Sequence, residues 1–188
     1  MQNQQIILIH GKNYKQMTKQ LLQAAGLADE IGSRDTPVAL KPNLVIGAPA
    51  SRGATTHPEL VAGVLEYLQE NGFRDLRVIE GSWVGSRTSE AAQTSGLLDV
   101  CRQYHVPFID LQKDASASYD AKGMQIKVCN EAMRPGFLIN MPVLKGHGQT
   151  LITCALKNAK GLIPNSEKRR FHALGLHAPI AHLNALIH

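Results

Sequence analysis

Short apolar or β-branched runs alternate along the chain with segments of helical period. This alternation is typical of parallel strands joined by crossover helices. The expected strands cover residues 6–9, 38–40, 76–79, 106–111, 124–128 and 137–141. The pattern therefore predicts one α/β domain over residues 1–188, with a mainly parallel sheet and crossover helices on both faces.

The clearest expected helix spans residues 58–71. Its apolar positions fall on one face: Leu60, Val61, Val64, Leu65 and Leu68. Thr56 is expected as its N-cap with Glu59 as capping-box partner, and Gly72 as its left-handed C-terminal residue. Further helices are expected over residues 14–25, 97–105 and 150–161, and the polar stretch 113–122 is expected to be a surface loop.

Composition narrows the class of protein. A chain of 188 residues is large enough to bury a core without disulfides or a structural metal. Its apolar runs are far shorter than the ~20 residues of a membrane span, and its first residues do not form a secretory signal, so a cytoplasmic location is expected. The three cysteines are odd in number and form no Cys-x-x-Cys pair, which favours reduced thiols and excludes a ferredoxin-type cluster loop. The apolar pattern that Pro179 opens still runs at Ile187, so the sequence leaves open whether the domain continues beyond its C-terminus.

Polar residues follow several of the expected strands. In open parallel sheets, ligands bind beyond the carboxyl ends of the strands, where loops converge. The strand ends here carry Lys41, Asn43, Glu80, Ser82 and Asn140, and Lys145 and His147 follow the last strand. Any one of these polar residues is explained by the exposure of strand ends to solvent. The whole set, however, predicts a ligand site at one edge of the sheet.

The region from Asn140 to Gly161 carries the densest signal. On a helix over residues 150–161, Thr153, Lys157 and Lys160 would share a polar arc. Asn158 would fall inside the apolar arc. A buried amide needs hydrogen-bond partners, so Asn158 either ties down a neighbouring loop or contacts a ligand. The lysines either form a solvated face or join Lys41 and Lys145 in holding a carboxylate or phosphate. No dinucleotide-binding or phosphate-loop glycine motif is complete.

Histidines crowd the last quarter of the chain. His172 and His177 are five residues apart, which places them about 140° apart on a helix, so they cannot form the i, i+4 zinc pair of metalloproteases. Loops can still bring them together as ligands of a divalent metal. His57, His147 and Lys145 are the candidate proton-transfer groups, and purely structural histidines are the alternative. The basic run 168–170 is expected to be a solvated turn, and with few aromatic residues it makes nucleic acid a minor alternative.

An ordered series of short motifs extends from about residue 37 to the C-terminus. It comprises residues 41–43, 55–60, 80–81 and 140–147, Thr150 with Thr153, residues 155–161 and 171–172, and His177. This series resembles the domain-of-unknown-function 362 family. The resemblance implies an α/β domain in a family often linked to iron–sulfur or ferredoxin proteins through a cysteine-rich module, which this chain lacks. Family members are also commonly longer.

The sequence favours a domain that binds a small anionic metabolite, with a divalent metal as a possible cofactor for an enzyme. The alternative is a non-catalytic domain that docks a redox or ferredoxin-like partner. Whether the chain is an enzyme, and whether it forms a homo-oligomer, stay open at this point.

Overall fold

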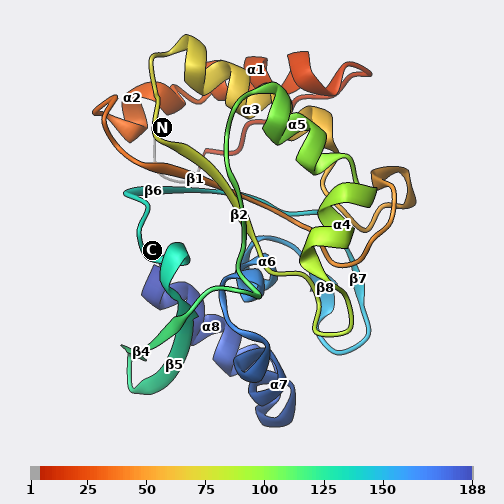
Figure 1. Ribbon diagram of the computed structural model, residues 1–188, viewed down its shortest axis with the longest axis vertical. Coiled ribbons are helices and arrows are strands. Elements are labelled where there is room, and N and C mark those ends of the chain that lie inside the picture. The colour runs from red at the N-terminus through yellow and green to blue at the C-terminus, as the bar shows by residue number, and fades with distance from the viewer. Residues whose placement is uncertain (1–4, 188) are drawn as a thin grey trace.

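A four-stranded parallel sheet forms the centre of the fold (Figure 1). The computed structural model describes residues 5–187. The strand order is β3-β2-β1-β6, with β1 at Val38–Pro42, β2 at Leu76–Glu80, β3 at Phe108–Asp110 and β6 at Phe137–Met141. All three pairings are parallel, which confirms the predicted mixed α/β fold with a mainly parallel sheet.

Helices from the first half of the chain cover one face of this sheet. They are α1 (Tyr14–Ala24), α2 (Leu27–Ile31), α3 (Pro58–Glu70), α4 (Thr88–Thr94) and α5 (Leu97–Gln103). The apolar stripe of α3 packs on alternate residues of the strands, so Leu65 and Leu68 lie in one cluster with Val38 and Leu40. Cys101 is buried in the same cluster, as expected for a packing residue.

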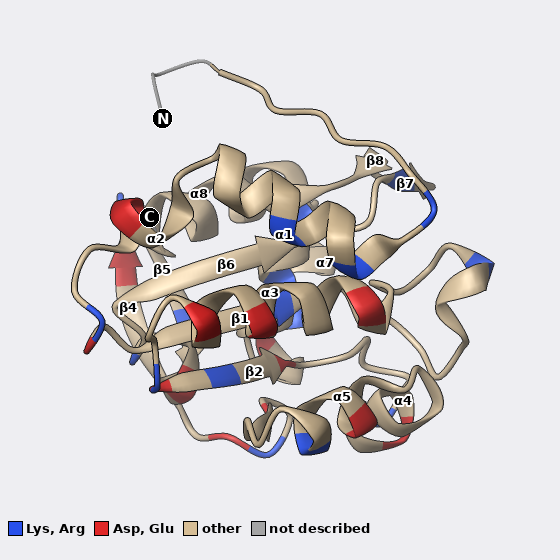
Figure 2. Cartoon of the chain, turned by 90° about the horizontal axis from the view of Figure 1, so that it is seen from above, with Lys and Arg blue, Asp and Glu red and all other residues tan. Residues whose placement is uncertain are grey.

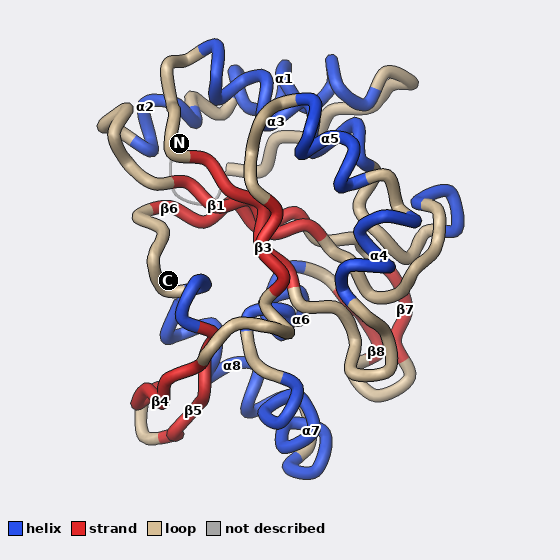
Figure 3. The backbone as a smooth tube through the Cα atoms, viewed as in Figure 1, coloured by secondary structure: helices blue, strands red, loops and turns tan. Residues whose placement is uncertain are grey.

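The opposite face is covered by an antiparallel hairpin and by helices from the end of the chain (Figure 3). These elements are β4 (Ser116–Ala121), β5 (Met124–Cys129), α6 (Ala155–Asn158), the 3-10 helix η3 (Ala159–Leu162), α7 (Asn165–Leu174) and α8 (His177–Ile187). Ala39 and Ile79 of the sheet pack there with Ile126, Leu162 and Phe171. Because both faces are covered, the central strands carry apolar residues at consecutive positions, as at residues 38–40 of β1 and 78–79 of β2, instead of alternating strictly with polar ones.

Three sequence-based assignments of elements are wrong. Residues 6–9 do not form a strand, because no neighbouring strand pairs with them, and Ile6 is 90% exposed. The polar stretch 113–122 contains β4, since its backbone pairs with all six residues of β5. Residues 150–161 are not one helix: β8 (Leu151–Thr153) pairs with β7 (Lys145–His147), and only four residues of α-helix follow. Local periodicity could not reveal pairing partners supplied by the rest of the chain.

Thr56 does not cap α3, whose N-cap is His57. Its hydroxyl instead accepts a hydrogen bond from the Asn43 backbone N–H and donates one to the Met141 carbonyl, both at 2.7 Å. Thr56 therefore ties the chain leaving β1 to the end of β6.

Replacing Thr56 by valine should lower the free energy of unfolding by about 2 kcal/mol, because the change leaves a buried N–H without its acceptor and a carbonyl without its donor. Urea denaturation followed by circular dichroism measures this loss. Thr56→Ser keeps the hydroxyl and is expected to retain most of the stability. Equal stability of the valine variant and the wild type would show that this link is not needed.

The strand order reverses at β1: β2 and β3 are added on one side of β1, and β6 is added on the other side. Figure 2 shows these parallel strands from above. The helix that follows β1, α3, and the helix that follows β6 and the β7–β8 hairpin, α6, lie on opposite faces of the sheet. Such a switch point opens a crevice at the carboxyl ends of the strands. The short 3-10 helices η1 (Ala50–Arg52) and η2 (Asn130–Ala132) complete the described elements. Within residues 5–187, none of the helices has the length and apolar character needed to cross a bilayer.

Candidate functional site

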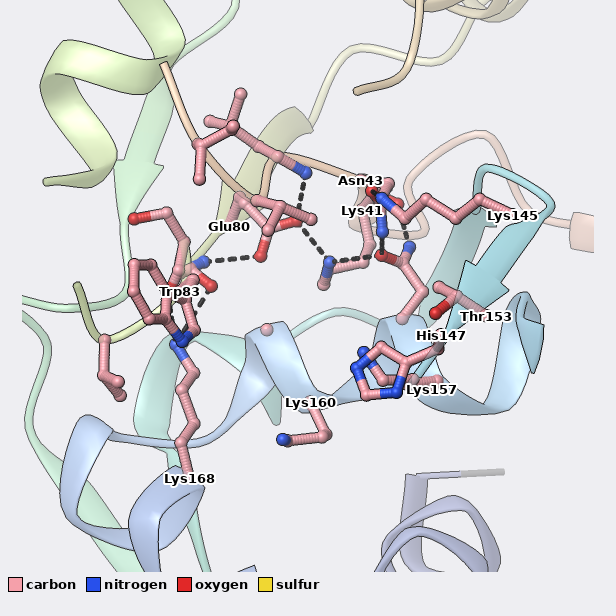
Figure 4. Close-up of a pocket in the computed structure, with 18 of the residues that line it drawn as sticks. Lys41, Asn43, Glu80, Trp83, Lys145, His147, Thr153, Lys157, Lys160 and Lys168 are labelled. Carbon is pink, nitrogen blue, oxygen red and sulfur yellow. Dashed lines mark hydrogen bonds and ion pairs between the residues drawn. The ribbon is translucent and has the colours of Figure 1, made fainter. Parts of the chain in front are cut away.

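A cavity of about 370 Å³ opens at the carboxyl edge of the sheet (Figure 4). Segments that follow β1 and β2 line one side, and the β7–β8 hairpin, α6, η3 and α7 line the other. The predicted site residues that line it are Lys41, Asn43, Glu80, Ser82, Lys145, His147, Lys157, Asn158, Lys160 and His172. The fold thus brings together residues that are far apart in the sequence.

Lys41 and Glu80 form an ion pair at the base of this cavity, and both side chains are at most 3% exposed. Glu80 also accepts hydrogen bonds from the backbone N–H groups of Gly81 (2.7 Å) and Leu44 (3.3 Å). Burial lowers the pKa of Lys41 and raises the pKa of Glu80, while their mutual attraction opposes both shifts. Gly161 packs against the pair so closely that a Cβ there would lie 2.6 Å from Lys41 Nζ, which explains the glycine.

Asn158 connects the strands that form the site. Its Oδ1 accepts hydrogen bonds from Asn43 Nδ2 (2.7 Å) and Lys41 Nζ (3.3 Å), and its Nδ2 donates to Asn140 Oδ1 (2.7 Å). Asn43 in turn accepts a hydrogen bond from Lys145 Nζ at 2.7 Å. The amide therefore ties β1 to β6, as one of the two sequence-based interpretations expected, and also borders the cavity.

The cavity is ringed by lysines. Lys41, Lys145, Lys157, Lys160 and Lys168 all line it, and Glu80 is the one carboxylate among the described lining residues. Burial, reinforced by repulsion from neighbouring ring lysines, lowers the pKa of Lys145, Lys160 and Lys168 to about 8 in each case. Burial also lowers the pKa of Lys157.

These ammonium groups differ in how many hydrogen bonds they make to other groups of the protein. Lys168 Nζ donates to the carbonyls of Gly81 (2.9 Å) and Ser82 (2.8 Å), and Lys145 also donates to the carbonyl of Ala54. Lys160 Nζ lies 3.0 Å from His172 Nε2. The ammonium group of Lys157 makes no hydrogen bond or ion pair within residues 5–187.

Two neutral donors border the same cavity. His147 Nδ1 accepts hydrogen bonds from the backbone N–H groups of Gln149 (3.1 Å) and Thr150 (3.2 Å), so the ring proton of the neutral form lies on Nε2. Burial and nearby lysines lower the pKa of His147, which favours this neutral form. Thr153 is 1% exposed, and its hydroxyl has no partner within the described residues.

The sequence missed several lining residues. Lys168 was expected in a solvated turn, but it lies on α7 and is 5% exposed. Lys168 and the buried Phe171 are three residues apart and therefore lie on one face of the helix. This spacing could have indicated that Lys168 faces the protein interior. Thr153 was expected on the polar side of a helix rather than in a strand. Trp83, which is 52% exposed, lines the cavity outside the set of predicted site residues.

Three other predicted residues either lie outside the cavity or already have a hydrogen-bond partner. His57 precedes α3, where its ring packs 4.5 Å from that of Tyr14 and its Nδ1 lies 3.8 Å from Glu59. Asn140 bonds to Asn158 without lining the cavity. Ser82 lines the cavity, but its hydroxyl already donates to the Ser86 carbonyl.

The two proposed metal ligands are placed differently. His172 lines the cavity, whereas His177 is an exposed residue at the start of α8 and does not. No group of three or more His, Cys, Asp or Glu side chains in the described range 5–187 is arranged to hold a metal ion. The two histidines therefore do not meet at the cavity.

Comparison with known proteins agrees with the motifs. The family described as "Domain of unknown function (DUF362)" matches residues 38–188. A curated relative, "Thylakoid-associated protein sll1697" of Synechocystis sp., is 30% identical over 135 residues. The aligned region covers 72% of this chain but 41% of that relative. The match across most of its length shows that the chain belongs to the DUF362 family.

Proposed function

We propose that this chain binds a small organic anion, carrying about two negative charges, in the cavity at the carboxyl edge of the sheet. The observation that carries the proposal is the ring of five lysines around one cavity, with Glu80 as the one carboxylate among the described lining residues. Lys41 already neutralises Glu80, so four ammonium groups remain without a countercharge. Like charges so close together repel one another, and an anionic ligand relieves that repulsion.

Apolar side chains at the rim indicate that the ligand has an organic part. Val45, Ile46, Trp83 and Val84 line the cavity beside the lysines. Ile46 is 40% exposed and Trp83 is 52% exposed, so both side chains offer contact surface to a ligand. A volume of about 370 Å³ lies at the lower end of the range of small-molecule sites.

The same positions limit which residues can act chemically on a bound ligand. Lys145 and His147 line the cavity and are the candidates for proton transfer, whereas His57 does not reach it. Docking of a redox protein and assistance by a divalent metal stay predictions.

Trp83 provides the test, because it is the single tryptophan of the chain and lines the cavity. Phenyl phosphate and phthalate, two aromatic dianions, are titrated at constant ionic strength while the tryptophan emission and the melting temperature are recorded. We expect saturable emission changes and a higher Tm with at least one dianion, and neither effect with benzylamine. No saturation by either dianion at millimolar concentration would overturn the proposal.

Binding of the anion should weaken as the pH rises through about 8. Lys145, Lys160 and Lys168, with pKa values near 8, carry their charge below this pH and lose it above. An anion stabilises the charged forms, so binding near pH 8 should also take up protons. Calorimetry in buffers of different ionisation enthalpy measures both effects. Constant affinity from pH 7 to 9.5, without proton uptake, would contradict the role of these lysines.

The lowered lysine pKa values also predict the pH dependence of the ligand-free protein. In the unfolded chain these lysines keep the ordinary pKa of 10.5, so between pH 8 and 10.5 the unfolded state binds more protons than the folded state. Their contribution to stability is therefore unfavourable below pH 8 and is relieved as the pH rises through this range. Affinity and this stability contribution should change in opposite directions.

A further inference from the structure

The unused hydrogen-bond donors of the cavity gather on one segment. Lys157 has no partner within residues 5–187, the Nε2–H of neutral His147 is free to donate, and the Thr153 hydroxyl is buried without a partner. All three belong to the β7–β8 hairpin or to α6, which follows it directly. Figure 4 shows them on one side of the cavity, with Lys160 beside them.

The Thr153 hydroxyl is the most informative of these groups. Thr153 lies in β8, and its β7 partner in the strand register is Lys145. Thr153 as a residue is 1% exposed, and its buried hydroxyl has no hydrogen bond, which weakens the ligand-free protein because desolvation of a polar group is not compensated. A valine of the same shape would avoid this cost, so the hydroxyl indicates a partner that arrives with the ligand.

We infer that the ligand is a phosphate monoester whose phosphoryl group lies among Thr153, His147 and Lys157. The inference rests on the proposed function and specifies its substrate class. A phosphate monoester carries about −1.5 to −2 charges at neutral pH and three acceptor oxygens. Three donors from separate positions suit these oxygens, and the neighbouring Lys160 supplies further positive charge.

A carboxylate fits this donor set less well. It has two coplanar oxygens and is typically recognised by the planar fork of an arginine. No arginine lines the cavity among the described residues, where the cations are all lysines that act as point charges. Trp83 and its apolar neighbours would then contact the organic group of the ester.

Phenyl phosphate and phthalate test the inference because both are aromatic dianions of similar size. We expect the wild-type chain to bind phenyl phosphate about 10-fold more tightly than phthalate, as hydrogen-bond complementarity of about 1.4 kcal/mol implies. The ³¹P resonance of phenyl phosphate should shift with saturation. Because this comparison needs no substitution, it does not depend on the folding of a variant.

Variants of Thr153 locate the phosphoryl group. Thr153→Val should weaken binding of phenyl phosphate about 10-fold and change phthalate binding less than about 2-fold, while Thr153→Ser keeps the wild-type preference. The melting temperature of ligand-free Thr153→Val should be at least that of the wild type, which verifies that the variant is folded.

The outcomes separate the inference from the proposal beneath it. If phthalate binds as tightly as phenyl phosphate and Thr153→Val affects neither, the phosphoryl assignment is overturned while anion binding stands. If neither dianion binds, the proposed function itself fails and the inference fails with it.

Discussion

Replacing Lys41 by methionine is expected to lower the free energy of unfolding by about 3–5 kcal/mol. Methionine fills a similar volume but cannot neutralise Glu80, whose carboxylate is at most 3% exposed. The remaining carboxylate must either stay charged in the interior or take up a proton, and both carry a free-energy cost. Urea denaturation at pH 7.5, followed by circular dichroism, measures the loss.

The double variant Lys41→Met with Glu80→Gln is the control. It removes the orphaned charge, and the glutamine oxygen can still accept the 2.7 Å hydrogen bond from the Gly81 backbone, although its amide nitrogen cannot accept the longer one (3.3 Å) from Leu44. It should be clearly more stable than Lys41→Met alone, because most of the loss comes from an uncompensated charge rather than from a lost contact. Equal destabilisation in the single and double variants would refute this explanation and point to packing instead.

Lys157→Glu should reduce the affinity for phenyl phosphate by about 100-fold, or about 2.7 kcal/mol. The change removes the ammonium group that has no partner in residues 5–187 and places a carboxylate where the ligand's charge would lie. Because the Lys157 ammonium group makes no hydrogen bond in this range and is repelled by its neighbouring lysines, its loss should not lower the stability. Fluorescence of Trp83 reports the affinity, and the urea midpoint reports the stability.

Lys127→Glu is the matched control for this charge reversal. Lys127 lies exposed on β5 and does not line the cavity. Because both variants replace one lysine by glutamate, they have the same net charge. It should change the affinity less than about 2-fold at physiological ionic strength, where distant charges are screened. Similar losses in both variants would indicate general electrostatic attraction rather than a defined site.

The sequence predicted the central sheet because each strand contains a short apolar run, such as the buried residues 38–40 of β1. It failed where tertiary pairing decides the structure. The polar segment with β4 becomes a strand because β5 lies beside it, whereas the apolar residues 6–9 stay unpaired. The expected helix over residues 150–161 fails at its first turns, where Leu151 has a φ of 60° and β8 pairs with β7.

The positions of some site residues follow from the geometry of parallel sheets. Lys41, Asn43 and Glu80 lie at the carboxyl ends of strands, and these ends meet at one edge of the sheet regardless of the loop conformations. Lys168 and Thr153 are brought to the cavity by later elements, and their roles depend on contacts that the local sequence does not encode. His57 belongs to the motif 55–60 at the start of α3 and was therefore predicted as a site residue. Its ring packs against Tyr14 and does not line the cavity.

The most direct test of the lysine ring is a titration of ¹⁵N-lysine-labelled protein with phenyl phosphate, in which NMR follows the side-chain Nζ resonances. Lysine-to-arginine variants assign the signals. We expect the signals of Lys157 and Lys160 to shift most and to saturate together, while the signal of Lys127 does not move. Uniform small shifts of all lysines, or no shift of the ring lysines while others move, would contradict this expectation.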